Sequence, residues 1–335
     1  MIKIHISDEK IKDIKKKHLE YFENNDPYRN NRSFLLELTE YYNSSTGEEK
    51  AYFKYLLDNY ETILTGNPDT LQNKIIKKIF LLFSQSLTDE ISNPKKSLHQ
   101  KTINVFNYTS FSGRSPNRWG AFKLIENIEL DVCPYCNRQY LTTIVKKKGY
   151  VKATLDHFWN KARYPFLAIS LFNLIPCCSI CNSSFKGEED FNITKNIHPY
   201  VEGFESFGKF ELDIGEKPKI EDLIGNDNDK LSFKVVPRDE NNKKADEYIN
   251  FFELQKVYGI HKEHVRELVQ KSLIYKESYV NYLIDEYENL FKDKSDIQKM
   301  ILGTYVNSND ISKRTLSKFT RDIAIELELL KTTEN

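Results

Sequence analysis

The sequence predicts an α+β fold in which a small central core with short strands lies between two mainly helical regions. In the first hundred or so residues, apolar side chains recur at spacings of three and four, as in helices that bury one face. The same spacing returns from about Ala245 and continues through Phe291. Between these regions lie segments rich in β-branched and aromatic residues and two closely spaced cysteine pairs. We therefore expect a helical region over residues 1–110, a core over 111–200, and an irregular segment followed by helices over 201–335.

Outside the core, five helices can be given bounds, in addition to the helical spacing from about Ala245 through Phe291. Asn67-Pro68-Asp69 is typical of a helix cap, and Asn309-Asp310 predicts the start of a final helix. Residues Asn93–Trp119 are rich in polar and turn-forming types and predict a connection into the core. The expected helices are Asp8–Glu23, Ser33–Tyr42, Glu48–Leu64, Thr70–Leu87 and Ile311–Leu330.

The core segments predict a β-hairpin followed by a helix. Tyr140–Val145 and Tyr150–Asp156 flank a run of three lysines, with Gly149 in the turn, and Ile180–Phe185 predicts the start of a helix. The 49 basic and 49 acidic residues of the whole chain cancel. From Cys133 to Gly187, however, eight basic residues face one acid, a net charge of +7 that suits binding to a phosphate backbone.

The composition excludes a membrane-spanning protein. No stretch reaches the roughly 18 apolar residues that cross a bilayer. The N-terminal residues lack the apolar run followed by small residues that a secretory signal requires. We therefore expect a cytoplasmic protein without a membrane partner.

Four of the five cysteines form two Cys-x-x-Cys pairs. Cys133 and Cys136 are separated from Cys178 and Cys181 by 41 residues, and four thiolates in such pairs suit a structural, tetrahedral Zn²⁺. The alternatives are buried free cysteines or a redox motif. Cys177 lies outside the x-x spacing and is expected not to bind the metal.

Side chains suited to phosphodiester hydrolysis lie between and beside these pairs. Asp156-His157 ends a predicted strand, Asn173 precedes Leu174-Ile175-Pro176, and Asn182 follows the last cysteine. Hydrolysis needs a base to activate water and a cation to neutralise developing charge. Histidine can act as that base near neutral pH, and carboxylate and amide oxygens are ligands for Mg²⁺.

The motifs resemble those of the HNH endonuclease family in its ββα-metal, treble-clef-like form. The resemblance implies that His157 is the general base and that Asp156 and Asn182 bind a catalytic Mg²⁺ or Mn²⁺. It also implies that Asn173 holds the histidine loop in place and that Lys186 approaches the scissile phosphate. Many relatives carry histidine at the position of Asn182, which leaves the identity of the metal open. The matching motifs are Cys-Pro-Tyr-Cys (133–136), Leu-Asp-His-Phe (155–158), Phe-Asn-Leu-Ile-Pro (172–176) and Cys-Ser-Ile-Cys-Asn-Ser-Ser-Phe-Lys-Gly (178–187).

The motif sequences are also similar to the HNH nuclease subunits of bacterial antiphage systems of the Septu type, including those attached to retrons. That similarity implies a nuclease effector acting on nucleic acid, most simply DNA, beside an ATPase subunit. Two alternatives stay open. One is a ribonuclease, for example one that attacks tRNA, and the other is a zinc module that binds nucleic acid or protein without cutting.

Overall fold

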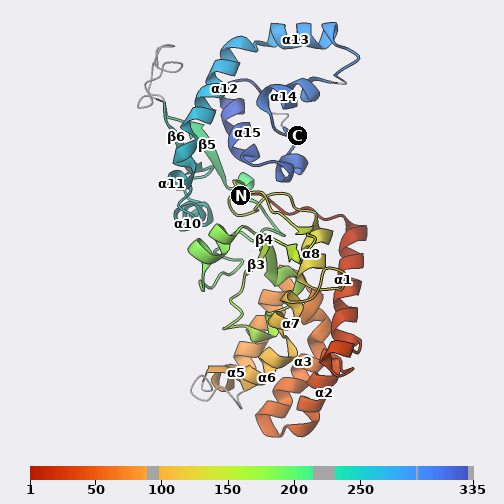
Figure 1. Ribbon diagram of the computed structural model, residues 1–335. Coiled ribbons are helices and arrows are strands. Elements are labelled where there is room, and N and C mark those ends of the chain that lie inside the picture. The colour runs from red at the N-terminus through yellow and green to blue at the C-terminus, as the bar shows by residue number, and fades with distance from the viewer. Residues whose placement is uncertain (89–97, 214–230, 292, 331–335) are drawn as a thin grey trace. The chain divides into compact units, whose positions relative to one another are not determined.

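The protein's structure is a computed structural model that describes residues 1–88, 98–213, 231–291 and 293–330. Within these residues helices predominate, and the strands form three antiparallel two-stranded sheets (Figure 1). This mixture agrees with the predicted α+β class. In the same ranges, no helix has the length and apolar character needed to cross a membrane. The chain divides into two compact units. Unit 1 comprises Met1–Ile4, Asp131–Tyr140 and Glu202–Asn335, and unit 2 comprises His5–Leu130 and Leu141–Val201.

The first helices of unit 2 pack around aromatic side chains. Phe22 of α1 stacks on Phe34 and Phe106, with ring centroids 5.9 and 5.4 Å apart. The Ser7 hydroxyl caps α1 by accepting a hydrogen bond from the Lys10 amide. The predicted bounds of α1 are confirmed, and those of α2 and α3 are confirmed to within two residues. The elements up to Thr88 are α1 (Asp8–Glu23), η1 (Pro27–Arg29), α2 (Phe34–Ser44), α3 (Gly47–Thr65), α4 (Pro68–Thr70), the π-helix η2 (Leu71–Ile76) and α5 (Lys77–Thr88).

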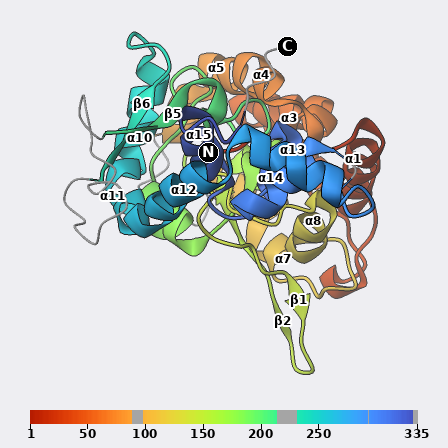
Figure 2. The same cartoon turned by 90° about the horizontal axis from the view of Figure 1, so that it is seen from above.

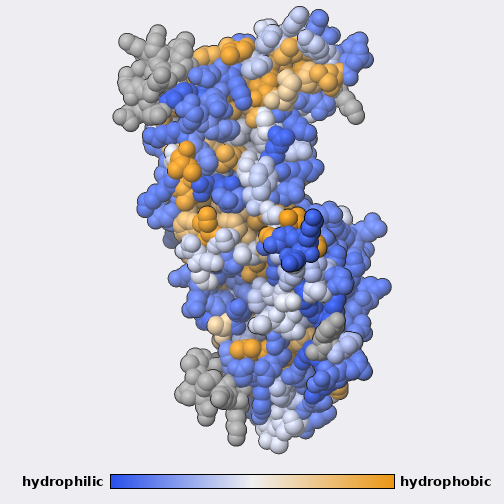
Figure 3. Space-filling model, in the orientation of Figure 1, coloured by the Kyte–Doolittle hydropathy of each residue, from blue (hydrophilic) through white to orange (hydrophobic). Residues whose placement is uncertain are grey.

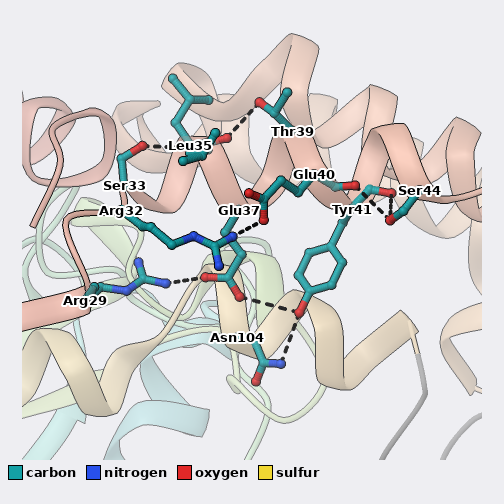
Figure 4. Close-up of polar contacts among 11 residues, drawn as sticks. Arg29, Arg32, Ser33, Leu35, Glu37, Thr39, Glu40, Tyr41, Ser44 and Asn104 are labelled. Carbon is teal, nitrogen blue, oxygen red and sulfur yellow. Dashed lines mark hydrogen bonds and ion pairs between the residues drawn. The ribbon is translucent and has the colours of Figure 1, made fainter.

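Polar contacts fix the start of α2 and join it to a later helix (Figure 4). The Ser33 hydroxyl caps α2 by accepting from the Leu36 amide at 3.0 Å, and Arg29 pairs with Glu37. The Tyr41 hydroxyl accepts a hydrogen bond from the Asn104 amide at 3.4 Å. Because Asn104 lies in α6 (Leu98–Val105), this contact links α2 to a segment 63 residues away in sequence.

The predicted connection at Asn93–Trp119 is wrong for much of its length. Residues 93–97 lie outside the described part, but α6 and α7 (Tyr108–Ser112) follow directly, and α8 (Ala121–Ile128) begins just after it. The Asn107 side chain caps α7 by accepting from the Ser110 amide at 2.7 Å. These helices have 5 to 8 residues, too few for the apolar spacing to be recognised among polar neighbours.

The predicted hairpin is confirmed only at its tip. β1 (Ile144–Val145) pairs with β2 (Tyr150–Val151), and Gly149 has a left-handed φ of 82° in the turn. The following strand, β3 (Thr154–His157), pairs instead with β4 (Leu174–Cys177). The prediction of one continuous strand through Asp156 is therefore wrong: β2 is largely exposed, whereas Leu155 to His157 of β3 are buried. Three short helices complete unit 2: η4 (Pro165–Leu167), η5 (Leu171–Asn173) and the π-helix η6 (Ile180–Lys186).

Unit 1 has a core of its own, in which Phe210 packs on Tyr258 and Phe319 with ring centroids 4.5 and 4.8 Å apart. A smaller apolar cluster around Val280 and Ile297 joins α13 to α14, and Figure 3 shows hydrophobic residues at the surface of this helix pair. The elements of unit 1 after Glu202 are η7 (Phe204–Ser206), β5 (Gly208–Leu212), β6 (Phe233–Pro237), α10 (Lys243–Phe251), α11 (Leu254–Tyr258), η8 (Gly259–His261), α12 (Lys262–Ile274), α13 (Glu277–Glu286), α14 (Lys294–Leu302), η9 (Ser308–Lys313) and α15 (Ser317–Glu326).

Two expectations for this unit are corrected. The segment expected to be irregular after Pro199 contains β5 and β6, which pair in antiparallel fashion, while residues 214–230 lie outside the described part. The expected final helix, Ile311–Leu330, begins only at Ser317, because the 3-10 helix η9 ends at Lys313, Arg314 is extended, and Leu316 takes a left-handed φ of 59°.

An ion triad connects the loop after α1 to the segment before α8. The Asp26 side chain is 6% exposed and binds Arg114 and Arg118, the latter with 2.7 Å between Nη2 and Oδ1. The Arg114 guanidinium also lies over the Tyr21 ring, 4.4 Å from its centroid. One carboxylate thus forms ion pairs with two guanidinium groups inside unit 2.

We expect Asp26→Asn to lower the free energy of unfolding of unit 2 by about 2–3 kcal/mol, because two partly buried arginines lose their counter-charge. Chemical denaturation followed by circular dichroism measures the change. The matched control is Lys54→Gln, which removes an exposed ion pair with Asp58 and should leave the midpoint of the denaturation curve unchanged. Equal midpoints for the two variants would contradict the role given to Asp26.

Candidate functional site

The four cysteines of the Cys-x-x-Cys pairs come together. The Sγ atoms of Cys133, Cys136, Cys178 and Cys181 all lie within 4.8 Å of one another. Four thiolates at 2.3 Å from a tetrahedral zinc ion lie about 3.8 Å apart, so the cluster has the dimensions of a structural zinc site. The two turns are closed locally, since the Arg138 amide donates to Cys136 Sγ and the Cys181 amide to Cys178 Sγ, each at 3.4 Å.

The β3–β4 pair brings the other predicted site residues into one region of unit 2. Asp156 is paired with Ile175, and His157 with Leu174, so Asn173 lies directly before the strand that faces His157. Asp156 is 2% and His157 9% exposed. Two ionisable side chains are therefore buried at the end of one strand, on its opposite faces.

The His157 imidazole is held in one orientation. Its Nε2 lies 2.9 Å from the carbonyl oxygen of Ala168, and its ring meets the Tyr108 ring edge-on at 4.4 Å. A carbonyl oxygen only accepts, so Nε2 carries the proton and Nδ1 keeps the lone pair of the neutral ring. Burial, together with the charge of Lys161, lowers the pKa of His157 to about 3. The ring is consequently neutral at pH 7, with Nδ1 able to accept a proton.

Asn173 clamps the segment that follows His157. Its side-chain Oδ1 accepts from the Trp159 amide at 2.7 Å, and its Nδ2 donates to the carbonyls of Trp159 and Leu167 at 3.1 and 2.8 Å. The backbone adds a hydrogen bond from the Phe158 amide to the Asn173 carbonyl at 3.0 Å. The fully buried amide thereby fixes both the chain leaving His157 and the turn that contains Ala168.

Lys186 is buried among protein oxygens. Its Nζ lies 3.9 Å from Asp156 Oδ1 and donates to the carbonyls of His157, at 3.2 Å, and Glu189. Burial lowers the pKa of Lys186, whereas the Asp156 charge opposes that shift. The ammonium would have to leave these partners to make the direct phosphate contact expected from the sequence.

Asn182 lies on η6, the π-helix that follows the second cysteine pair. Its side chain is partly exposed, unlike those of Asp156 and His157. The helix closes with a hydrogen bond from the Gly187 amide to the Asn182 carbonyl at 2.8 Å, five residues back. Gly187 has φ 51° and ψ −123°, a conformation that only glycine adopts readily, so the helix ends at Lys186.

Sequence reasoning missed three side chains around this region: His18, Tyr108 and Trp119. The His18 Nε2 lies 2.6 Å from the Ile169 carbonyl, next to the Ala168 carbonyl that holds His157. Its Nδ1 accepts from the Trp119 indole at 3.2 Å. Burial lowers the pKa of His18 to about 4. No motif could reveal these contacts, because His18 and Ile169 are 151 residues apart.

Cys177 is not one of the four clustered cysteines, as expected, and its side chain lies near the Asp156 carboxylate. It is fully buried opposite Thr154, whose hydroxyl donates to the Cys177 carbonyl at 2.7 Å. Burial, and next the negative charge of Asp156, raise the pKa of the Cys177 thiol well above its usual value. A neutral thiol therefore lies beside the Asp156 carboxylate.

We expect the purified protein to bind one zinc ion per chain, and Cys133→Ser or Cys178→Ser to reduce that content to near zero, because three thiolates hold the ion far less tightly. Metal analysis after gel filtration measures the content. Cys177→Ser is the matched control and should keep one zinc. Loss of zinc from the control alone would contradict the ligand set.

We expect the stability of the protein to fall as the pH drops from about 6.5 to about 4, partly through His18. Its pKa is lower in the folded than in the unfolded state, so the unfolded chain binds the proton more tightly and acid favours unfolding. His18→Gln should flatten the dependence of Tm on pH in this window, with a difference in unfolding free energy of at most about 3 kcal/mol. Replacement of the exposed His5 by Gln should leave the slope unchanged, and equal slopes for all three proteins would contradict the assignment.

Comparison of the chain with protein-family models, with curated proteins and with solved structures finds no match. The function of the site is therefore inferred from its own residues. These are a cysteine tetrad with the dimensions of a zinc site, a carboxylate and a neutral imidazole at the end of a strand, and a short helix that carries an amide side chain.

Proposed function

We propose that this chain is a metal-dependent HNH-type endonuclease that hydrolyses DNA phosphodiester bonds. The observation that carries the proposal is the orientation of His157, whose Nε2 is bound to the Ala168 carbonyl so that Nδ1 is left as a base. In support, two antiparallel strands followed by a helix carry Asp156, His157 and Asn182 in the order of the ββα-metal motif.

The donor set fits a hard divalent ion. Asp156 and Asn182 offer carboxylate and amide oxygens, the ligands that Mg²⁺ and Mn²⁺ prefer. When bound, such an ion would neutralise charge on the phosphate and on the leaving oxygen. The cysteine tetrad would hold zinc in a structural role, since four thiolates leave no open position for a substrate.

In the proposed reaction, His157 Nδ1 takes a proton from water, and the water oxygen attacks phosphorus. The bond from phosphorus to the 3′ oxygen breaks, and that oxygen leaves with a proton from solvent, which yields a 5′-phosphate and a 3′-hydroxyl. Asn173 keeps the imidazole loop fixed. We assign Lys186 a positioning role, in which its buried ammonium holds Asp156 and the His157 carbonyl. A role in antiphage defence, beside an ATPase, rests on the motif resemblance alone.

We expect the zinc-loaded protein to nick supercoiled plasmid in Mg²⁺ or Mn²⁺, and His157→Ala to slow cleavage by about 10²–10⁴-fold through loss of the general base. Parallel reactions with RNA compare the two substrates. The variant must match the parent in zinc content and melting temperature.

His5→Ala, an exposed histidine given the same substitution, should cleave at the parental rate. Cleavage by His157→Ala at the parental rate would overturn the assigned base, and cleavage of RNA alone would favour the ribonuclease. Binding to nucleic acid without cleavage of either would favour a zinc module that only binds.

A further inference from the structure

The β1–β2 hairpin of unit 2, residues 141–153, extends away from α7 and α8 in Figure 2. Its turn consists of Lys146, Lys147, Lys148 and Gly149, all exposed. Within the described residues, the three ammonium groups make no hydrogen bond and no ion pair. A Cβ built on Gly149 would meet no atom within 4 Å, so the tip stands clear of the rest of the unit.

The base of the hairpin, by contrast, is fixed to the body of the unit. The Tyr150 ring packs edge-on against Phe122 with centroids 5.5 Å apart. The Lys152 ammonium donates to the carbonyl and the hydroxyl of Ser112 at 2.8 and 2.9 Å. A rigid base and a free tip are the properties of a ribbon that reaches into a partner.

The chemistry of the hairpin points to an anionic partner with an apolar surface between its charges. No acidic residue occurs from Val132 to Leu155, so the lysines of the hairpin have no nearby counter-charge in the sequence. The β-branched side chains Ile144, Val145 and Val151 are 51%, 64% and 38% exposed. Neighbouring residues of a strand point to opposite faces, so both faces of the ribbon carry exposed apolar side chains.

We propose that this hairpin enters the major groove of duplex DNA. The inference rests on the proposed function, since it names the form of nucleic acid that the nuclease site would receive. A two-stranded ribbon fits the B-DNA major groove, about 12 Å wide, where thymine methyl groups offer apolar contacts between two rims of phosphate. The major groove of duplex RNA is too narrow for it, and a single strand has no groove.

The position of the hairpin in the chain limits where it can act. Asp156 lies nine positions after Lys147, a span of at most about 32 Å. One turn of B-DNA measures about 34 Å along its axis. The ribbon therefore contacts the groove within about one helical turn of a phosphate bound at the nuclease site.

The test measures binding by the zinc-loaded His157→Ala protein, which keeps cleavage out of the measurement. The probes are duplex DNA of about three helical turns, one of its single strands, and the corresponding duplex RNA. We expect the added triple change Lys146→Gln, Lys147→Gln and Lys148→Gln to weaken binding to duplex DNA at least about tenfold. It should also lower the slope of log affinity against log salt by about 2–3, because three phosphate contacts are lost. Its effect on the other two probes should be smaller.

The matched control replaces three exposed lysines of the same unit, Lys74, Lys77 and Lys78, by Gln and should change the affinity for duplex DNA less than twofold. Chemical methylation of guanine N7, which lies in the major groove, gives a second readout. The His157→Ala protein should protect N7 from methylation, and the same protein with the three lysine changes should not. Unchanged affinity of the hairpin variant, equal losses on all three probes, or no binding of duplex DNA would overturn the proposal. The nuclease proposal can fail separately from the hairpin proposal. In that case the wild-type protein would cleave no DNA, but its binding to duplex DNA would still depend on the hairpin lysines.

Discussion

The pairing of β3 with β4 is the constraint on which the geometry of unit 2 depends. Because His157 lies opposite Leu174 and Asp156 opposite Ile175, the register alone decides which side chains share a face. A slip by one residue would exchange the two faces and carry the carboxylate away from Cys177. The pair has only four residues per strand, so its register depends on contacts outside it. Asn173, bound to both sides of the turn after His157, supplies three of them.

Burial of the charged side chains of Asp156 and Lys186 beside this strand pair is energetically costly unless each has a partner. The ammonium of Lys186 has three protein oxygens within reach, and one belongs to Asp156. The neutral thiol of Cys177 near that carboxylate, and the neutral imidazole of His157 at the end of the same strand, add no further charge. Asp156 and Lys186 are therefore buried among mainly apolar side chains of unit 2, where electrostatic interactions are stronger than in water.

The sequence predicts those features of the fold that depend on residues close together in the chain, such as helix bounds and metal-binding turns. α1 has its predicted bounds because Ser7 caps it and apolar residues recur along one face, and the paired cysteines converge as their spacing predicted. The prediction failed where a partner lies far away in the chain. β3 was assigned to the neighbouring hairpin because its true partner begins 17 residues after it. His18 and Tyr108 carry no motif, since their importance comes only from the segments against which they fold.

The hydrogen bond between His18 and Ile169 closes a loop of 151 residues, and this has a consequence for folding. Contacts between distant segments form late, because the entropy of closing the loop must be overcome before the contact can stabilise anything. During synthesis, α1 can fold long before the turn beside His157 has been made. The His18 imidazole meets the Ile169 carbonyl only when both ends of that loop are in place, so α1 is joined to the turn whose Ala168 carbonyl orients His157 by a contact that local folding alone cannot form.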